Sequence, residues 1–344
     1  MLVSILLPFH NAAPWIAETI RSIQAQSYAD WELIAVNDFS TDDSRAILQA
    51  LAATDERIRI FQNEEKGIIP ALQLALSHAA GDYFTRMDAD DIMSEQRLEL
   101  MIKKMETSPT KTIVTGKVKY FTRNDGVQPI VIGFDGLNVQ SHLSISKGYL
   151  AYESWLNQRI DQNDHFDHIY RECVVASPNW LARTNEIRET KIFDQLEYPE
   201  DYDMTFRWMT NGFTISGIPE TTLFWREHPD RTSRNSSIYD QASFFALKLG
   251  WFHELHPTES VAILGAGIKG KLTAQHLINE GRDFHWFDLE WKKYGAPILG
   301  KQIENYEDLS TEKLLIAVYP SNKKPLLAFL NEKGFEIGRN AWFL

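Results

Sequence analysis

About the first hundred residues alternate short apolar runs with amphipathic segments, and no other feature constrains the fold as strongly. The apolar runs predict strands, while the segments between them repeat apolar residues at helical spacing, as Ile16, Ile20 and Ile23 do. This alternation is typical of a parallel sheet with helices on both faces. We therefore expect an α/β fold with a doubly wound, mostly parallel sheet. The expected strands are residues 3–8, 31–36, 58–62 and 81–87, and the expected helices are residues 14–26, 41–53, 70–80 and 94–106.

The middle of the chain is less regular. Its strongest local signals are the turn sequence Asn-Asp-Gly, a proline that opens a helix and a glycine that ends it. Ser94 is a candidate cap for the helix that follows it. The expected elements are a hairpin over residues 117–134 with its turn at 124–126, helices around Trp155 and Trp180, a helix from Pro199 to Gly212, two short strands, and a long helix over residues 236–255.

A second alternation of strands and helices begins after residues 256–260, which are the best candidate for a linker. We therefore expect two domains, residues 1–256 and residues 257–344. In the second domain, glycines with G-x-G-x-x-G spacing follow a strand and open a helix, and an aspartate ends the next strand. This context fits a nucleotide-binding turn. The alternative is that the glycines serve only the tight turn. The candidate nucleotide-binding residues are Gly265, Gly267, Gly270 and Asp288.

The composition excludes several classes of protein. The formal net charge is −12, so the surface repels a phosphate backbone and nucleic acid is not an expected partner. Cys173 is the only cysteine, which excludes a disulfide framework and favours a reducing compartment. No apolar run approaches the roughly 20 residues of a membrane-spanning helix. We expect a cytoplasmic protein without a transmembrane segment, with peripheral attachment at the inner face of the membrane as an open alternative.

Three polar segments follow expected strands, at residues 9–11, 37–43 and 88–91. Ligands of parallel sheets bind beyond the carboxyl ends of the strands, so these segments predict a shared site. The third segment reads Asp-Ala-Asp-Asp, and carboxylates that close together repel one another unless a counter-charge is present. A Mg²⁺ or Mn²⁺ ion, which prefers oxygen ligands, would supply that charge. The alternative is an exposed acidic turn.

With these segments, the N-terminal domain resembles the inverting family 2 glycosyltransferases of the GT-A fold. The likeness covers residues 1 to about 235, and the C-terminal domain resembles the small Rossmann-like N-terminal domain of sugar acetyltransferases. The sequence departs from the family pattern at His10, Phe39 and Gln73, near the expected nucleotide, which leaves the base and the sugar open. The segments similar to the family's motifs, in the family's order, are residues 4–11, 33–44, 86–92, 198–208 and 225–234.

The resemblance implies a role for individual residues. Asp90 would bind the metal, with Asp88 nearer the ribose and Asp91 closing the turn. Alternatives remain, because Asp38 could serve an Asx turn or helix cap and Asp201 could simply stabilise a helix start. Donor nucleotide binding is implied for Pro8, Asn11 and Asp38. Contact with the diphosphate or metal is implied for Arg226 and His228. General base catalysis is implied for Asp201, with Glu200 as its neighbour, and Asp203 is expected to face solvent. Arg86 is a further candidate for phosphate contact.

These expectations combine into a function. The resemblance implies a metal-dependent inverting glycosyltransferase of the hexosyltransferase type. The donor would be a nucleotide sugar, with a UDP-sugar favoured. The acceptor would be a hydroxyl of a glycan or glycolipid, in bacterial surface polysaccharide synthesis. The nearest enzyme alternative is a nucleotidyltransferase, although residues 8–14 lack its glycine-rich basic loop. The residues are also compatible with an NAD-type oxidoreductase built around the C-terminal glycines, and with a non-catalytic nucleotide-sugar binding protein. The sequence does not predict an oligomeric state.

Overall fold

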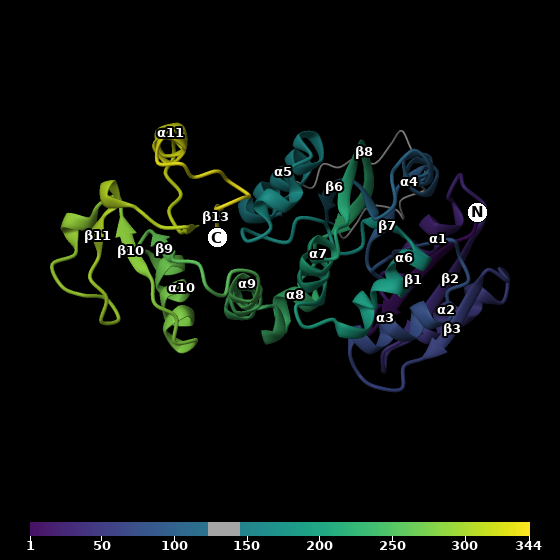
Figure 1. The fold of residues 1–344 in the computed structure, drawn as a ribbon. Helices are drawn as coiled ribbons and strands as arrows, with labels where there is room; N and C mark the ends of the chain where they lie inside the picture. Colours follow the sequence, from purple (N-terminus) through teal and green to yellow (C-terminus); the bar gives the residue numbers. More distant parts are fainter. Residues whose placement is uncertain (123–144) are drawn as a thin grey trace. The chain divides into compact units, whose positions relative to one another are not determined.

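A computed structural model describes residues 1–122 and 145–344 (Figure 1). The chain divides into two compact units. The first comprises residues 1–163, 175–200 and 207–231, and the second comprises residues 164–174, 201–206 and 232–344. Each unit combines segments that are separated in the sequence. The expected domain boundary after residue 256 stays a prediction.

The first unit is built on an eight-stranded sheet with the strand order β3-β2-β1-β4-β7-β6-β8-β5 (Figure 1). The four strands from β3 to β4 are mutually parallel, whereas β7 is antiparallel to both of its neighbours. This arrangement confirms the expected α/β fold with a mostly parallel sheet. The strands are β1 (Val3–Phe9), β2 (Trp31–Asn37), β3 (Ile58–Gln62), β4 (Tyr83–Arg86), β5 (Ile92–Met93), β6 (Thr112–Phe121), β7 (Trp180–Arg183) and β8 (Thr214–Arg226).

Helices cover the strands of this sheet. Every residue of β1 and β2 is buried, which explains their nearly continuous apolar sequence. Helix α3 packs on β1 and β2, and α5 packs on β6 and β8. The helices are α1 (Ile16–Gln24), α2 (Ser44–Ala52), α3 (Ile68–Ser77), α4 (Arg97–Glu106), α5 (Lys147–Gln162), α6 (Thr184–Thr190) and α7 (Glu200–Thr210), whose residues belong to both units. None of the helices in the described part of the chain is long and apolar enough to cross a lipid bilayer.

The structure corrects the prediction of a helix around Trp180, because this residue begins strand β7. The indole ring lies edge-on to Phe84 at 5.2 Å and to Trp208 at 5.5 Å, and its Nε1 donates to the Ser177 carbonyl at 2.7 Å. Pairing of β7 with a strand on each side outweighs local propensity. The helix expected around Trp155 is confirmed as α5.

Two further expectations about the irregular region are corrected. Ser94 is not a helix cap, since α4 begins at Arg97 and the Ser94 amide donates instead to the Thr222 carbonyl at 3.1 Å. The two short strands expected after residue 212 form one strand of 13 residues, β8, whose pairing with β6 shifts register near Gly116. The turn of the hairpin expected over residues 117–134 lies outside the described residues.

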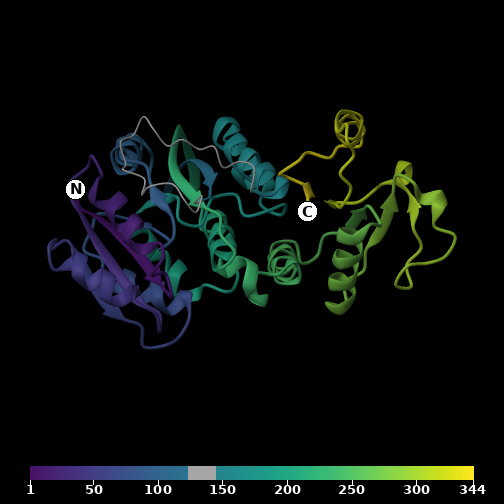
Figure 2. The same ribbon diagram turned by 180° about the vertical axis from the view of Figure 1, so that it is seen from behind.

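The second unit contains a five-stranded sheet in which every pairing is parallel, with the order β11-β10-β9-β12-β13. Figure 2 shows it from behind, with α10 in green beside it. The short strands β11 and β13 carry too few residues to be predicted. The elements are α8 (Thr232–Asn235), α9 (Gln241–Leu255), β9 (Val261–Leu264), α10 (Ile268–Asn279), β10 (His285–Asp288), β11 (Glu304–Asn305), β12 (Lys313–Ile316), α11 (Lys324–Glu332) and β13 (Ala341–Phe343), with short 3-10 turns η2 (His165–His168), η3 (Ile192–Gln195), η4 (Ser237–Tyr239), η5 (Trp291–Lys293) and η6 (Tyr306–Asp308) across the two units.

Lys248 on α9 makes the stability of the second unit dependent on pH. Burial lowers the pKa of this lysine to about 7, against the attraction of Glu172. The unfolded chain binds a proton between about pH 7 and pH 10 that the folded state lacks, so stability rises with pH across this window. We expect Lys248→Met to be more stable than the wild type at pH 7. Its advantage should shrink by up to about 1.4 kcal/mol per pH unit towards pH 10.

Urea unfolding at pH 7, 8 and 9 would test this expectation. The exposed Lys271→Met on α10 serves as the matched control, for which no pH-dependent difference is expected. A free-energy difference between Lys248→Met and wild type that stays constant from pH 7 to pH 9 would contradict the assignment.

Candidate active site

The polar segments predicted to converge follow strands β1, β2 and β4, which are parallel neighbours. Their carboxyl ends therefore meet at one edge of the sheet. The Asp38 amide donates to the Phe9 carbonyl at 2.8 Å, and the Asn11 amide donates to Ser40 Oγ at 3.1 Å. These bonds join the first two segments directly, which agrees with the predicted shared site.

The third segment, Asp88 to Asp91, presents three carboxylates with three different partners. Asp88 Oδ1 accepts a hydrogen bond from Arg86 Nε at 2.7 Å. Asp90 Oδ2 lies 2.8 Å from His228 Nε2, and Asp91 Oδ1 accepts from the Arg226 amide at 2.7 Å. Arg226 at the end of β8 and His228 just after it are within reach because β5, directly after the acidic segment, pairs with β8.

The three carboxylates differ in acidity. Burial raises the pKa of Asp91 well above its usual range, and repulsion by Asp90 and Asp88 adds to this. Burial also raises the pKa of Asp88, although the charge of Arg86 opposes the rise. Burial acts on Asp90 in the same direction, but the hydrogen bond with His228 and the charge of Arg231 outweigh it and lower the pKa. Of the three carboxylates, Asp90 is therefore the one whose surroundings favour the ionised form.

Arg226 supports the acidic segment from inside the protein. Its guanidinium donates to the Asp90 carbonyl at 2.6 Å and to Glu18 Oε2 at 2.7 Å, and it lies 4.8 Å from the centre of the Trp15 ring. The side chain is only 1% exposed. Arg226 thus holds the backbone of the acidic segment, and its contact with a diphosphate or metal stays a prediction.

Sequence reasoning missed two cations beside the acidic segment. Arg97 is fully buried and donates to Thr85 Oγ1 at 2.8 Å and to the Pro178 carbonyl at 2.6 Å. Its position was signalled by spacing, because it shares the apolar face of α4 with Met101 and Met105. Arg231 contacts Glu227 Oε2 at 3.1 Å and lies 5.2 Å from the Trp225 ring centre, and its charge acts on Asp90 and Asp91.

Asp38 does not form an Asx turn in its own loop. Its carboxylate accepts hydrogen bonds from Asn63 Nδ2 at 2.8 Å and from the Gly67 amide at 2.9 Å, so it fixes the chain where α3 begins. Asp38 therefore acts near the N-terminus of α3, by holding the amide of its N-cap residue Gly67, which resembles the helix-cap alternative. Nucleotide binding by Asp38 stays a prediction. Pro8 is buried in β1, and Asn11 Oδ1 accepts from the Thr41 amide at 2.8 Å.

Helix α7 begins with Glu200 and Asp201, after Pro199 at the N-cap position. Glu200 is 2% exposed and accepts from Arg86 NH1 at 2.9 Å, within the first unit. Asp201 belongs to the second unit and is partly exposed. Asp203 was expected to face solvent, but it is buried and accepts from Trp251 Nε1 at 2.8 Å. The expectation failed because α9, distant in sequence, covers this face of the helix.

The glycine-rich turn of the second unit is explained largely by backbone geometry. Gly265 has φ +119°, and a side chain on Gly270 would lie 1.9 Å from the Gly265 carbonyl oxygen. A side chain on Gly267 would meet open space. Asp288 accepts from the Ala266 amide at 2.7 Å and so holds the turn itself. Nucleotide binding at these four residues stays a prediction, and the turn alternative accounts for Gly265 and Gly270.

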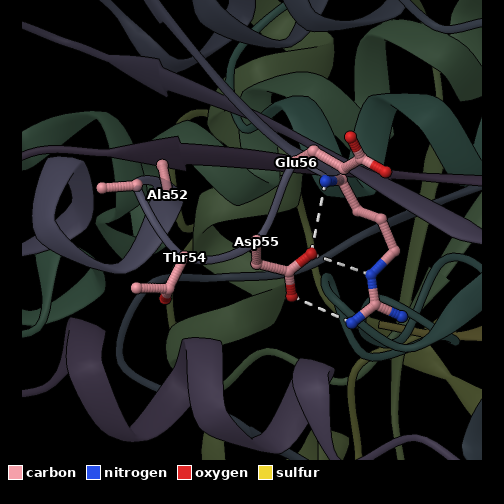
Figure 3. Close-up of a pocket in the computed structure, with 6 residues that line it drawn as sticks. Ala52, Thr54, Asp55 and Glu56 are labelled. Atoms are coloured by element: carbon pink, nitrogen blue, oxygen red, sulfur yellow. Dashed lines mark hydrogen bonds and ion pairs between the residues drawn. The ribbon is translucent and has the colours of Figure 1, made fainter.

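A surface hollow lined by residues 52–57 lies away from this edge (Figure 3). It precedes β3 and therefore lies at the amino ends of the parallel strands. In its lining, Arg57 donates from Nε and NH2 to the Asp55 carboxylate at 2.9 Å each, and these bonds lower the pKa of Asp55 to about 2. Because it lies at the amino ends of the strands, the hollow is not part of the candidate active site.

Comparison with known proteins identifies the family. The model for glycosyl transferase family 2 matches residues 4–163. EpsE of Bacillus subtilis, a protein assigned as a glycosyltransferase, is 41% identical over 239 residues, which are 69% of this chain and 77% of EpsE. The chain belongs to glycosyl transferase family 2. It is thus a glycosyltransferase, as the motif order predicted.

One further relative and one solved structure are similar to this chain. WfgD of Escherichia coli, a UDP-Glc:α-D-GlcNAc-diphosphoundecaprenol β-1,3-glucosyltransferase, is 39% identical over 105 residues, 30% of this chain and 41% of WfgD. The structure of S. aureus TarS 1–349 in complex with UDP-GlcNAc aligns with a TM-score of 0.53 and 19% identity, covering 80% of this chain and 72% of that one. At this identity the likeness shows the fold, which agrees with the GT-A type expected of this family 2 glycosyltransferase.

Phe39 offers a test of strain in this site. It follows β2, at a position where the sequence departs from the family pattern, and it takes the left-handed conformation with φ +57°. This conformation costs an L-residue about 1–2 kcal/mol that glycine does not pay. We expect Phe39→Gly to be more stable than Phe39→Ala by about 1 kcal/mol, with the alanine variant as the control for loss of the exposed ring. Thermal or urea unfolding measures both, and equal stabilities would contradict the expectation.

Proposed function

We propose that this family 2 glycosyltransferase uses Mg²⁺ or Mn²⁺ and transfers a sugar with inversion. The donor is a nucleotide sugar, a UDP-sugar by preference, and the acceptor is a hydroxyl of a glycan or glycolipid. The observation that carries the proposal is the pairing of Asp90 with His228 at 2.8 Å beyond the carboxyl end of β4, next to the buried Arg86 and Arg226.

The Asp90 and His228 side chains fit a divalent cation. The hydrogen bond with His228 lowers the pKa of Asp90, which favours the ionised form that a metal ligand requires, and the side chain is 27% exposed. Mg²⁺ is commonly held by one or two protein ligands, with substrate phosphates and water completing the shell. Within residues 1–122 and 145–344 no group of three or more His, Cys, Asp or Glu is placed to hold a metal ion, so the diphosphate would supply further ligands. When bound, the cation supplies Lewis acidity to the leaving diphosphate.

The chain's own residues supply the remaining functions. We assign Asp201 as the base that takes the proton from the acceptor hydroxyl, because a carboxylate opposite the leaving group gives inversion. Asp38 and Asp88 bind the nucleoside, with Pro8 and Asn11 in the same wall. The charge of Arg231 lowers the pKa of Asp90 and so helps to keep it available to a cation.

The relatives support the choice of donor and acceptor. The name of WfgD specifies a UDP-sugar donor and a diphosphoundecaprenol-linked acceptor, and TarS 1–349 has been crystallised with UDP-GlcNAc. By extension, this chain would act in bacterial surface polysaccharide synthesis, in the cytoplasm or at the inner face of the membrane. The sugar and the linkage are left open by His10, Phe39 and Gln73, where the family pattern is not kept.

A thermal-shift screen of nucleotides and nucleotide sugars, with and without Mn²⁺, tests the donor site. A ligand that binds only the folded state raises the unfolding midpoint by mass action. We expect a metal-dependent rise with UDP or a UDP-sugar. A rise with NAD alone, insensitive to metal, would move the binding function to the glycines of the second unit and overturn the proposal.

Two amide substitutions separate metal binding from base catalysis. We expect Asp90→Asn and Asp201→Asn each to lower kcat by about 100-fold or more. Asp90→Asn should also lose the Mn²⁺-dependent thermal shift with UDP, whereas Asp201→Asn should keep it. The matched control is Asp43→Asn, an exposed acid at the N-cap position of α2. Wild-type transfer by either test variant, with the control unchanged, would remove that residue from the assigned site.

A further inference from the structure

We propose that Arg86 is a positioning residue that ties the metal-binding strand end to the start of helix α7. The inference rests on the proposed function, because it assigns the base to Asp201, the residue after Glu200. Arg86 NH1 donates to Glu200 Oε1 at 2.9 Å, and Arg86 Nε donates to Asp88 Oδ1 at 2.7 Å. One guanidinium thus joins a carboxylate just beyond β4 to a second carboxylate, which lies 114 positions after Arg86 in the chain.

The geometry argues against Arg86 as a phosphate contact, the role that the sequence suggested for it. Its side chain is 5% exposed, and two edges of its guanidinium are occupied by carboxylates. Arginine's rigid planar fork suits such a bridge, since its donors hold a fixed relation to each other. A lysine offers one mobile ammonium and cannot fix two carboxylates in the same way.

The burial of the Arg86–Glu200 ion pair means that a contribution to stability alone does not explain it. Glu200 is 2% exposed, so both members of its ion pair have lost their water. Replacing a buried ion pair by apolar groups of similar volume is often neutral or stabilising, whereas removing one partner is costly. Because stability alone does not account for this buried ion pair, we infer that it serves to position the two segments it joins. Here it joins the segment assigned to donor and metal to the first turn of the helix that carries the assigned base.

The bridge has a functional consequence. If the first turn of α7 loses its anchor, donor and metal can still bind at Asp88 and Asp90, but the acceptor base is no longer held for proton transfer. Misplacement by about 1 Å is sufficient to reduce a rate by about 100-fold. The loss should therefore appear in kcat for sugar transfer, while the donor KM changes little. Hydrolysis of the donor by water should rise relative to transfer.

Glu200→Gln is the first test, because it keeps the shape of the side chain and leaves the Arg86–Asp88 bond in place. We expect kcat for transfer to fall about 10- to 100-fold, with the donor KM within about twofold of wild type and a higher ratio of hydrolysis to transfer. Arg86→Lys should show the same pattern, without rescue by its retained charge. The matched control is Asp55→Asn, which breaks an arginine–aspartate pair at the opposite edge of the sheet and should leave both rates unchanged.

The double variant Arg86→Met/Glu200→Met separates positioning from stability. It removes both charges together, and Asp88, whose side chain is 24% exposed, retains access to water. A merely structural ion pair predicts that melting temperature and kcat recover together relative to Arg86→Met. Positioning predicts that the melting temperature recovers while kcat stays low. Recovery of both, or wild-type kcat in Glu200→Gln, would overturn the inference.

Failure of the underlying function gives a different result. Wild-type protein that transfers no sugar from any nucleotide sugar, with or without Mn²⁺, refutes the proposed function before any variant is compared. Wild-type transfer that depends on Asp201, together with normal kinetics in Glu200→Gln and Arg86→Lys, refutes only the positioning role.

Discussion

The crowding of carboxylates beyond β4 is the constraint on which the candidate site depends. Asp88, Asp90 and Asp91 lie within four positions, and burial would press each of them towards its neutral form. The surrounding cations come from β4, α4 and the end of β8, so the segment is held by elements far apart in the sequence. These surroundings affect the three pKa values differently, because they lower that of Asp90 while those of Asp88 and Asp91 are raised.

This arrangement explains features of the fold that have no evident role in stability. Strand β5 is only two residues long, yet its pairing with β8 brings the Arg226 amide to Asp91 and sets His228 against Asp90. The antiparallel strand β7 interrupts the parallel order and supplies, from the residues before it, the Pro178 carbonyl that binds Arg97. Strands β5 and β7, which are antiparallel to their neighbours, thus act with β8 to place the hydrogen-bond partners of charged residues that follow β4.

The sequence was informative where burial is set by neighbours in the chain. The parallel strands and their helices were predictable because β1 and β2 bury both faces and the helices keep a 3.6-residue period. The acids assigned to the site were proposed from motif order, and the structure places those of residues 88–91 beside buried arginines. The environments of Trp180 and Asp203, and the partners of the buried arginines, were not predictable, because distant strands and helices form them. An arginine such as Arg97 looks like a surface charge until tertiary packing buries it.

The two sheets carry aspartates at strand ends but use them differently. In the second unit Asp288 binds the Ala266 and Glu290 amides, so its carboxylate is satisfied by backbone and serves the turn. In the first unit Asp90 meets an imidazole, and its side chain keeps a 27% exposed surface. A carboxylate saturated by backbone amides has little left to offer a cation, whereas one that faces a titratable ring and solvent does. This difference, more than the glycine pattern, favours the first sheet as the place of chemistry.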